Sequence, residues 1–442
     1  MRAPQFLDDI LIGLFRFNTR GFLRMRETDG AVPPPPAGGG CHLYVHIPFC
    51  EVLCPFCSFH RVQHCPAQAQ PYFKALREEI TLYHRAGHRF EGAYFGGGTP
   101  TIEPAELVQT IRLVRTLFPV REVSVETNPK DLTPEVLQAL QDCGVTRLSV
   151  GVQSFDDTLL REMGRHEKYG GGAEIFAHIR RAARRFPTVN VDLIFNQPHQ
   201  TLASLRHDLD LARASGANQI SCYPLMTSPA VLKRMAATMG RPDRRRLRHF
   251  YDAIHRSLGW DYTPVSAWCF ARQRGTADEY IVNTENYVGV GSGAFSYLDG
   301  TLYATTFSLR AYVERVARGL TGITARHPLS AIERMRYTLL VKLFGLELDF
   351  QRAGARHGRG FFVRLLGELL TLRLLGAVER GPRGWVPTMR GRYWLMLMMS
   401  EFFESVNAYR DEMRKRVASD NGQTAEGFDR LKEHRSDAPA AA

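Results

Sequence analysis

Three cysteines lie close together in the stretch CEVLCPFC, residues 50–57. Cys50, Cys54 and Cys57 have the spacing C-x3-C-x2-C, so three thiols on one short loop can converge on one metal centre. Thiolate ligands select zinc, copper(I) or an iron–sulfur cluster. One tight cysteine cluster in a large chain favours metal binding or catalysis over a disulfide framework. The three cysteines leave a fourth ligand to be found.

Three completions of this site are open. His60 or His64 would complete a structural zinc site of three cysteines and one histidine. Cys65 would complete an iron–sulfur cluster bound by four thiolates. In the third arrangement one metal position has no protein ligand and is left for a substrate or cosubstrate, as in catalytic metal sites.

The charge balance of the chain is basic. Its 57 Lys and Arg and 45 Asp and Glu give a formal net charge of +12, and arginines concentrate in residues 180–186 and 241–250. Such runs are typical of solvated helix faces, and the alternative is a positive field that attracts an anionic substrate. Basic and aromatic residues do not interleave in the way typical of nucleic-acid binding, so we expect no nucleic-acid partner.

The sequence contains no signal for a membrane or for secretion. No uninterrupted apolar run reaches about 18 residues, so we expect no transmembrane helix. Charges interrupt the segment DDILIGLFRFNTRGF before it could form the apolar part of a secretory signal. These features predict a cytoplasmic protein.

Strands and helices alternate after the proline-rich stretch near residue 35. Apolar runs predict strands at residues 42–49, 92–98, 122–128, 147–155, 189–195 and 219–225. Helical patterns lie between them at about 70–86, 103–117, 133–142, 171–185 and 201–215. Thr133 as N-cap, Pro134 at the first helical position and Gly144 after the end support the third helix.

This alternation predicts parallel βα units, arranged either as a doubly wound sheet or as a barrel. Polar residues lie at or just after the C-terminal ends of several predicted strands: Gly96–Thr99, Glu126, Gln153 and Asp192. In both architectures ligands bind at that edge of the sheet. We therefore expect the functional site at the C-terminal rim of the strands.

The chain divides into five predicted segments. Residues 1–40 form a basic segment and a Pro/Gly linker, residues 41–228 the α/β core, and residues 229–326 an extension that includes the substrate region. Residues 327–417 form a small helical, winged-helix-like domain with a short hairpin around VERGPRGWVP, and residues 418–442 a disordered tail. The apolar run 393–403 is expected to be a packed core helix, with a partner-binding face as the alternative.

The motifs YVHIPFCEVLCPFC, FGGGTPT, VETNP, LSVGVQSF and VDLIF, in this order, resemble the radical S-adenosylmethionine (SAM) superfamily. More narrowly, they resemble the branch that contains oxygen-independent coproporphyrinogen III oxidase, the related heme chaperone and the class C radical SAM methyltransferases. The resemblance covers residues 42 to about 400. It implies an α/β fold with a partial (β/α)6 barrel, a [4Fe–4S] cluster and one or two molecules of SAM.

The resemblance also implies a set of site residues. Cys50, Cys54 and Cys57 would bind three irons, and the amino and carboxylate groups of SAM would complete the fourth. The residues that would contact SAM or flank its pocket are Tyr44, Phe56, Gly97, Gly98, Thr99, Glu126, Gln153, Arg165, Asp192, Pro224 and Val290. Tyr44 would also have a catalytic role. The implied partners are a small anionic, porphyrinogen-like substrate and an electron donor such as flavodoxin or ferredoxin.

Some positions depart from the patterns of this branch. Phe59 stands where the oxidases have a further cysteine, as in the chaperones, but the chaperone heme motif His-Asn-x-x-Tyr-Trp is absent from VNTENYVGVGSGAF. Residues 196–201 are NQPHQT in place of the usual LPGQT pattern.

Four functions therefore remain open. The first is a tetrapyrrole enzyme that oxidises coproporphyrinogen III, and the second is a class C methyltransferase or other radical tailoring enzyme. The third is a heme-trafficking protein, for which the candidate axial ligands are His42, His46, His60 and His64. The fourth is a zinc-stabilised module without redox chemistry.

Overall fold

The computed structural model describes residues 8–9, 11–13, 15–16, 22–38, 40–273, 282 and 284–417. The predicted disordered tail, residues 418–442, and part of the predicted N-terminal basic segment lie outside the described residues. In the described part of the chain, no helix combines the length and the apolar composition that crossing a membrane requires.

Seven parallel strands form the centre of the molecule. In spatial order they are β12 (Asn286–Val290), β2 (Cys41–Ile47), β5 (Gly92–Gly97), β6 (Glu122–Thr127), β7 (Arg147–Gln153), β8 (Thr188–Phe195) and β9 (Gln219–Pro224). Strands β2, β5, β6, β7, β8 and β9 are the six predicted from the apolar runs. Because they are parallel, their C-terminal ends meet at one rim, as expected.

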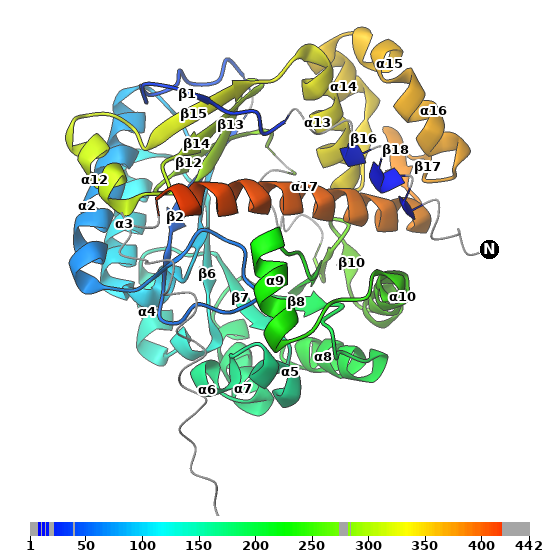
Figure 1. Cartoon of the computed structure of the whole chain (residues 1–442), viewed down its shortest axis with the longest axis horizontal. Helices are drawn as coiled ribbons and strands as arrows, with labels where there is room; N and C mark the ends of the chain where they lie inside the picture. Colours follow the sequence, from blue (N-terminus) through cyan, green and yellow to red (C-terminus); the bar gives the residue numbers. More distant parts are fainter. Residues whose placement is uncertain are drawn as a thin grey trace, which may run out of the picture.

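The predicted helices lie between these strands and cover the outside of the curved sheet (Figure 1). They are α2 (Pro66–Arg85), α3 (Pro104–Leu117), α4 (Pro134–Asp142), α7 (Gly172–Ala183) and α8 (Leu202–Ala214). Thr133 caps α4 as predicted, because its side chain accepts a hydrogen bond of 3.3 Å from the N–H of Val136.

Antiparallel strands extend the sheet at both edges. Beyond β12 lie β13 (Phe295–Leu298), β14 (Thr301–Thr305), β15 (Ile323–Pro328) and β1 (Arg26–Glu27). Beyond β9 lie β11 (Cys269–Ala271) and β10 (Thr263–Pro264). The order runs from β1 at one edge to β10 at the other, so the sheet of described residues is an open, partial barrel. The fold class predicted from the sequence is therefore confirmed.

A buried carboxylate joins the first helix to this extension. Glu79 of α2 accepts hydrogen bonds from the hydroxyl of Tyr312 in α12 (Leu309–Ala317) at 2.6 Å and from the N–H groups of Gly291 at 2.9 Å and Gly322 at 2.6 Å. Burial raises the pKa of Glu79, and these donors oppose that rise. The contact fixes the glycine-rich turn after β12 against α2.

The C-terminal region is helical with one small sheet. Its helices are α13 (Ala331–Phe344), α14 (Phe350–His357), α15 (Gly360–Arg364), α16 (Leu366–Leu374) and α17 (Met389–Arg416). The small sheet has the order β16 (Leu348–Asp349), β18 (Gly384–Pro387) and β17 (Val378–Arg380), which includes the predicted hairpin.

Helix α17 connects this region to the barrel. Its first half contains the apolar run at 393–403, which is largely buried in the main hydrophobic core, so the prediction of a packed helix is confirmed. Its second half continues across the rim of the parallel strands, as the orange-to-red helix in Figure 1 shows. Helix α17 also contacts α9 (Pro229–Thr238), which follows β9.

Candidate functional site

A cavity of about 390 Å³ opens at the C-terminal rim of the parallel strands. Thirteen of the fourteen residues that the resemblance assigns line it: Tyr44, Cys50, Cys54, Phe56, Cys57, Gly97, Gly98, Thr99, Glu126, Gln153, Arg165, Asp192 and Pro224. The fourteenth, Val290, is fully buried in β12, where it pairs with Val45, and is outside the cavity lining. Parallel topology thus brings together residues that lie up to 180 positions apart in the chain.

The three cysteines lie on residues 48–64, which we call the cysteine loop. Its two ends pair as the short strands β3 (Phe49–Cys50) and β4 (Val62–Gln63), which closes the loop above the rim. Cys50 and Cys54 are buried and Cys57 is partly exposed, and all three sulfurs face the cavity. In the described residues, no group of three or more His, Cys, Asp or Glu side chains is close enough to hold a single metal ion. A polynuclear cluster does not need such a group, because each thiolate binds a different iron.

Neither histidine proposed for a zinc site joins the cysteines. His60 is buried, and its Nε2 contacts the hydroxyl of Ser292 at 3.1 Å. His64 Nε2 contacts the carboxylate of Glu103 at 2.8 Å. Cys65 is exposed at the start of α2. The geometry therefore favours the third arrangement, in which no further side chain completes the site.

Buried cations surround the cysteine sulfurs. Arg165 Nη1 lies 3.8 Å from the sulfur of Cys54. Arg61 Nη2 donates to the carbonyl oxygens of Cys54 at 2.5 Å and Cys57 at 3.0 Å. Burial would raise the pKa of Cys54, but Arg165, Arg61 and Lys168 together hold it below its usual value. These cations favour the thiolate, which is the form that binds metal.

Two of these arginines have donors without an acceptor. The Nε and Nη1 atoms of Arg61 and the Nε atom of Arg165 are buried and have no hydrogen-bond partner among the described residues. Arg61 is 5% exposed and Arg165 is 4% exposed. Buried N–H groups are rarely left unpaired because each unpaired group costs about 1–3 kcal/mol or more. The cavity wall is therefore built for an anionic occupant.

The glycine-rich segment 96–99 is attached directly to the cysteine loop. The N–H of Gly98 donates to the carbonyl of Ile47, and the N–H of Thr99 donates to the carbonyl of Phe49, both at 2.8 Å. Gly97 has a φ of +119°, and a Cβ there would lie 2.7 Å from the His46 ring. The close approach of these two backbones holds the cysteine loop in place.

Thr99 and Asn128, which follows β6, extend the contact between the glycine segment and the cysteine loop. The Thr99 hydroxyl donates to the sulfur of Cys50 at 3.6 Å and accepts from Asn128 Nδ2 at 2.9 Å. The Oδ1 atom of Asn128 accepts from Arg165 at 3.4 Å. Asn128 was not predicted, although it lies inside the VETNP motif. It links the glycine segment to the cation beside Cys54.

Glu126 lies near the end of β6, whereas Asp192, which was predicted near a strand end, lies in the middle of β8. Glu126 accepts from the hydroxyl of Tyr94 at 2.9 Å and from the N–H of Gly97 at 3.0 Å. Asp192 accepts from Asn190 Nδ2 at 2.7 Å and from the Ser149 hydroxyl at 3.0 Å. Both carboxylates are thus oriented by neutral donors while they line the cavity.

Two further predicted residues have unusual local environments. Gln153 has a φ of +71° at an irregularity between β7 and β8, a strained conformation that turns its side chain at the rim.

The hydroxyl of Tyr44 contacts His46 Nδ1 at 2.9 Å, and His46 Nε2 donates to the carbonyl of His60 at 2.9 Å. Burial lowers the pKa of His46 to about 4, so His46 is neutral and its Nδ1 accepts from Tyr44. Burial, and secondly Glu126, raise the pKa of Tyr44, which keeps it protonated.

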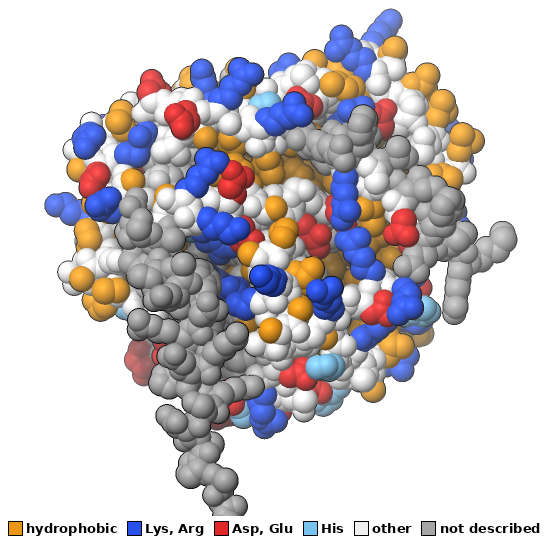
Figure 2. Space-filling model, viewed as in Figure 1, with side chains coloured by type: hydrophobic (Ala, Val, Ile, Leu, Met, Phe, Trp, Pro, Cys, Tyr) orange, Lys and Arg blue, Asp and Glu red, His pale blue; other side chains and the backbone are white. Residues whose placement is uncertain are grey.

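Apart from these residues, the cavity is lined mainly by apolar side chains. Its walls include Leu225, Met226, Trp268, Tyr287, Phe295, Leu302, Tyr337, Phe402, Phe403 and Val406. Asn407 and Arg410 of α17 also line it, and Arg410 donates to Asn407 Oδ1 at 2.9 Å and lies over the rings of Phe59 and Phe295. Figure 2 shows Lys and Arg side chains among exposed hydrophobic ones on this face. No sequence motif indicated the contribution of α17.

Comparison with known proteins agrees with this site. The sequence model of the Radical SAM superfamily matches residues 44–212. An oxygen-independent coproporphyrinogen III oxidase of Bradyrhizobium diazoefficiens is 37% identical over 352 residues, which cover 73% of this chain and 77% of the relative. The chain belongs to the radical SAM superfamily, in the branch of this oxidase.

The chain is also similar to a heme chaperone and to a coproporphyrinogen III oxidase of known structure. The heme chaperone HemW of Bacillus subtilis is 28% identical over 347 residues, which cover 74% of this chain and 90% of the chaperone. The coproporphyrinogen III oxidase HemN of Escherichia coli has the same fold, with a TM-score of 0.70 at 23% identity over 84% of this chain and 91% of HemN.

The cofactors of the superfamily are SAM and a [4Fe–4S] cluster. The cavity fits them, because its lining brings three thiols together with arginines whose buried N–H groups have no acceptor among the described residues. Held by Cys50, Cys54 and Cys57, the cluster would supply one electron to SAM and so give access to hydrogen-atom chemistry. The protein's part is to bind, orient and shield these groups.

Proposed function

We propose that this radical SAM protein is an oxygen-independent coproporphyrinogen III oxidase-like enzyme. Two of the substrate propionates would each lose one hydrogen atom and the carboxylate as CO2, leave one electron for an acceptor, and become a vinyl group. The observation that carries the proposal is one cavity whose lining combines the three cysteines, many apolar side chains and Arg410. An apolar macrocycle with carboxylate substituents matches apolar walls that include an arginine, beside the cysteines that would hold the cluster.

In this proposal Cys50, Cys54 and Cys57 bind three irons of the cluster, and SAM completes the fourth. Glu126 and Asp192 accept hydrogen bonds from SAM, and the glycine segment lies beside its methionine end. Tyr44 flanks the SAM pocket as a protonated hydroxyl. The 37% identity to the Bradyrhizobium oxidase supports the choice of substrate.

Arg410 would recognise a propionate of the substrate. Its side chain lines the cavity, and Asn407 together with the rings of Phe59 and Phe295 orients it. Removing it should raise the KM for coproporphyrinogen III more than it lowers kcat, by about tenfold or more, since charged hydrogen bonds contribute about 1.5–3 kcal/mol. Arg416 is the matched control, because it lies on the same helix but is exposed and pairs with Glu412.

Heme handling is the second candidate, because the HemW of Bacillus subtilis matches the chain over 90% of its own length and Phe59 follows the chaperone pattern. The proposed axial histidines argue against it. His42, His46, His60 and His64 have hydrogen-bond partners, and none of them is among the described residues that line the cavity. No specific contact favours a methyltransferase.

The test is product analysis under anaerobic conditions with dithionite, SAM and coproporphyrinogen III. We expect protoporphyrinogen, CO2 and 5′-deoxyadenosine, with Arg410→Gln raising KM and Arg416→Gln leaving it unchanged. Cleavage of SAM without decarboxylation would refute the oxidase proposal. A Soret shift on heme titration without any such product would favour heme handling, and S-adenosylhomocysteine among the products would favour the methyltransferase.

A further inference from the structure

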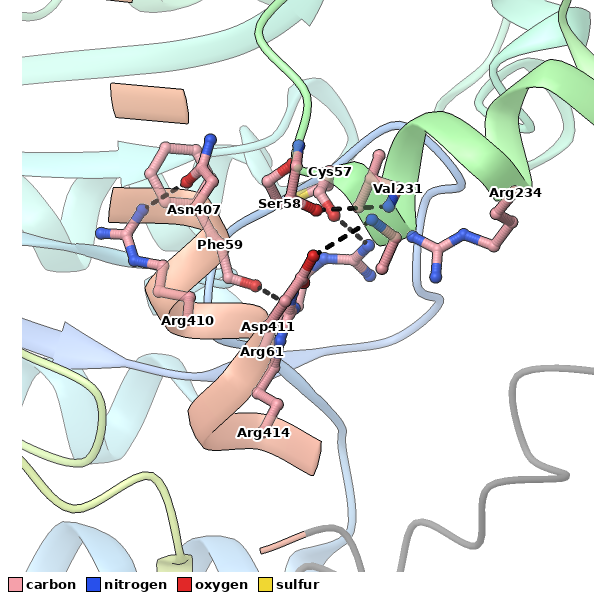
Figure 3. Close-up of polar contacts among 12 residues, drawn as sticks. Cys57, Ser58, Phe59, Arg61, Val231, Arg234, Asn407, Arg410, Asp411 and Arg414 are labelled. Atoms are coloured by element: carbon pink, nitrogen blue, oxygen red, sulfur yellow. Dashed lines mark hydrogen bonds and ion pairs between the residues drawn. The ribbon is translucent and has the colours of Figure 1, made fainter. Parts of the chain in front are cut away.

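Three arginines from separate parts of the chain meet at the cysteine loop (Figure 3). Arg61 lies at the end of the loop and binds the carbonyls of Cys54 and Cys57. Arg234 of α9 donates to the carbonyl of Pro55 from Nε at 3.1 Å and from Nη2 at 2.9 Å. Arg414 of α17 donates to the carbonyl of Phe59 at 2.8 Å. We call these three residues the arginine cradle.

The cradle concentrates positive charge away from solvent. Arg61 is 5% exposed, and the side chain of Arg414 is 13% exposed and pairs with Asp411. Burial and the charges of Arg61 and Arg414 lower the pKa of Arg234 to about 10, so the three arginines repel one another. Asp411 pairs with Arg414, whereas Arg61 keeps two buried nitrogens without an acceptor among the described residues, which leaves an excess of positive charge at the loop. Such an excess is unfavourable in a low-dielectric site unless an anion compensates it.

The orientation of Arg61 indicates where that anion belongs. Two of its nitrogens, Nε and Nη1, are buried without a partner, although Nη2 binds two loop carbonyls. Arg61 lines the same cavity as Cys50, Cys54 and Cys57, and its Nη2 is held against the backbone of two of these cysteines. Three thiolates that carry an iron–sulfur cluster have a net negative charge and sulfur atoms that accept N–H hydrogen bonds.

We propose that the arginine cradle is the charge-compensating site of the iron–sulfur cluster, and that Arg61 is a positioning residue whose unpaired N–H groups donate to its sulfur atoms. Because Arg234 and Arg414 belong to α9 and α17, the cradle also couples cluster loading to the position of these two helices. Hydrogen bonds to cluster sulfurs and nearby positive charge both favour the reduced state, so Arg61 makes the cluster easier to reduce.

The test compares Arg61→Gln, Arg61→Lys and Arg234→Gln with the control Arg416→Gln, in full-length protein reconstituted anaerobically with iron and sulfide. Iron and sulfide content and the midpoint potential of the cluster, followed by its EPR signal, are measured without SAM, so that the SAM carboxylate cannot supply the effect. Circular dichroism establishes that each variant is folded.

We expect Arg61→Gln to lose the cluster or to shift its midpoint potential to more negative values, with a smaller shift in the same direction for Arg234→Gln. Arg61→Lys keeps the charge and should lie between Arg61→Gln and the wild type. Arg416→Gln should match the wild type. A folded Arg61→Gln protein with wild-type iron content and potential overturns the proposal. Should Arg61→Gln fail to fold, the iron content and midpoint potential of Arg234→Gln decide whether the proposal holds.

Discussion

The contact between the glycine segment and the cysteine loop makes Gly98→Ala an informative substitution. A Cβ at residue 98 would lie 2.6 Å from the carbonyl oxygen of Phe49, and 2.8 and 2.9 Å from the carbonyl carbon and oxygen of Pro48. All three atoms belong to the backbone, so no side-chain rotation can relieve the overlap. Ordinary contact begins at 3.4 Å, so the loop must move by about 0.8 Å at Phe49.

That displacement should lower both the stability of the protein and its content of iron and sulfide. Overpacking of this kind costs about 1–3 kcal/mol of unfolding free energy. Cys50 follows Phe49 directly, and the Gly98 and Thr99 N–H groups hold the loop at Ile47 and Phe49. We therefore expect a lower urea midpoint for the metal-free protein and less iron and sulfide per chain after anaerobic reconstitution.

Gly367→Ala is the matched control. Residue 367 lies in α16, and a Cβ there would meet no atom within 4 Å. Alanine in a helix is favoured over glycine by up to ~1 kcal/mol, so this variant should be as stable as the wild type or more stable, with full iron content. If Gly98→Ala retains wild-type stability and iron content, the close approach of the two segments does not constrain the site as argued.

Three further predictions concern the cysteines and two buried carboxylates. Cys57→Ser should abolish cluster loading, whereas Cys65→Ser should leave iron content unchanged because Cys65 is exposed, and equal losses in both would contradict the assignment. Burial, and secondly the charge of Glu401, raise the pKa of Glu404 to about 7. The folded protein therefore holds an extra proton, and its unfolding free energy should fall by up to ~3 kcal/mol as pH rises from about 4.5 to 7. Glu404→Gln should flatten that dependence in urea titrations at several pH values, and an unchanged slope would exclude this cause. Glu79→Ala leaves three buried donors without an acceptor, so we expect a loss of ~3 kcal/mol or more, and a loss below ~1 kcal/mol would contradict its role.

The local pattern of the sequence was sufficient to predict the strands and helices of the parallel core. The six apolar runs became β2 and β5 to β9, and the five helical patterns became the helices between them, because strand and helix periodicities are set by neighbouring residues. The rim position of the polar residues followed from the strand direction alone. Asn128 shows the limit of this reasoning, since its role depends on Thr99 and Arg165, which approach it only in the folded sheet.

Residue types and their spacing thus determined the three-thiol loop, the alternation of strands and helices, and the family to which the chain belongs, since each of these is encoded in short segments. Only the tertiary structure decided how the site is closed. Arg61, Arg234, Arg410 and Arg414 read in the sequence as unremarkable basic residues, and those of α17 lie some 350 positions after the cysteines. Their function arises from long-range packing of α9 and α17 over the rim, and no local pattern encodes contacts that distant segments make.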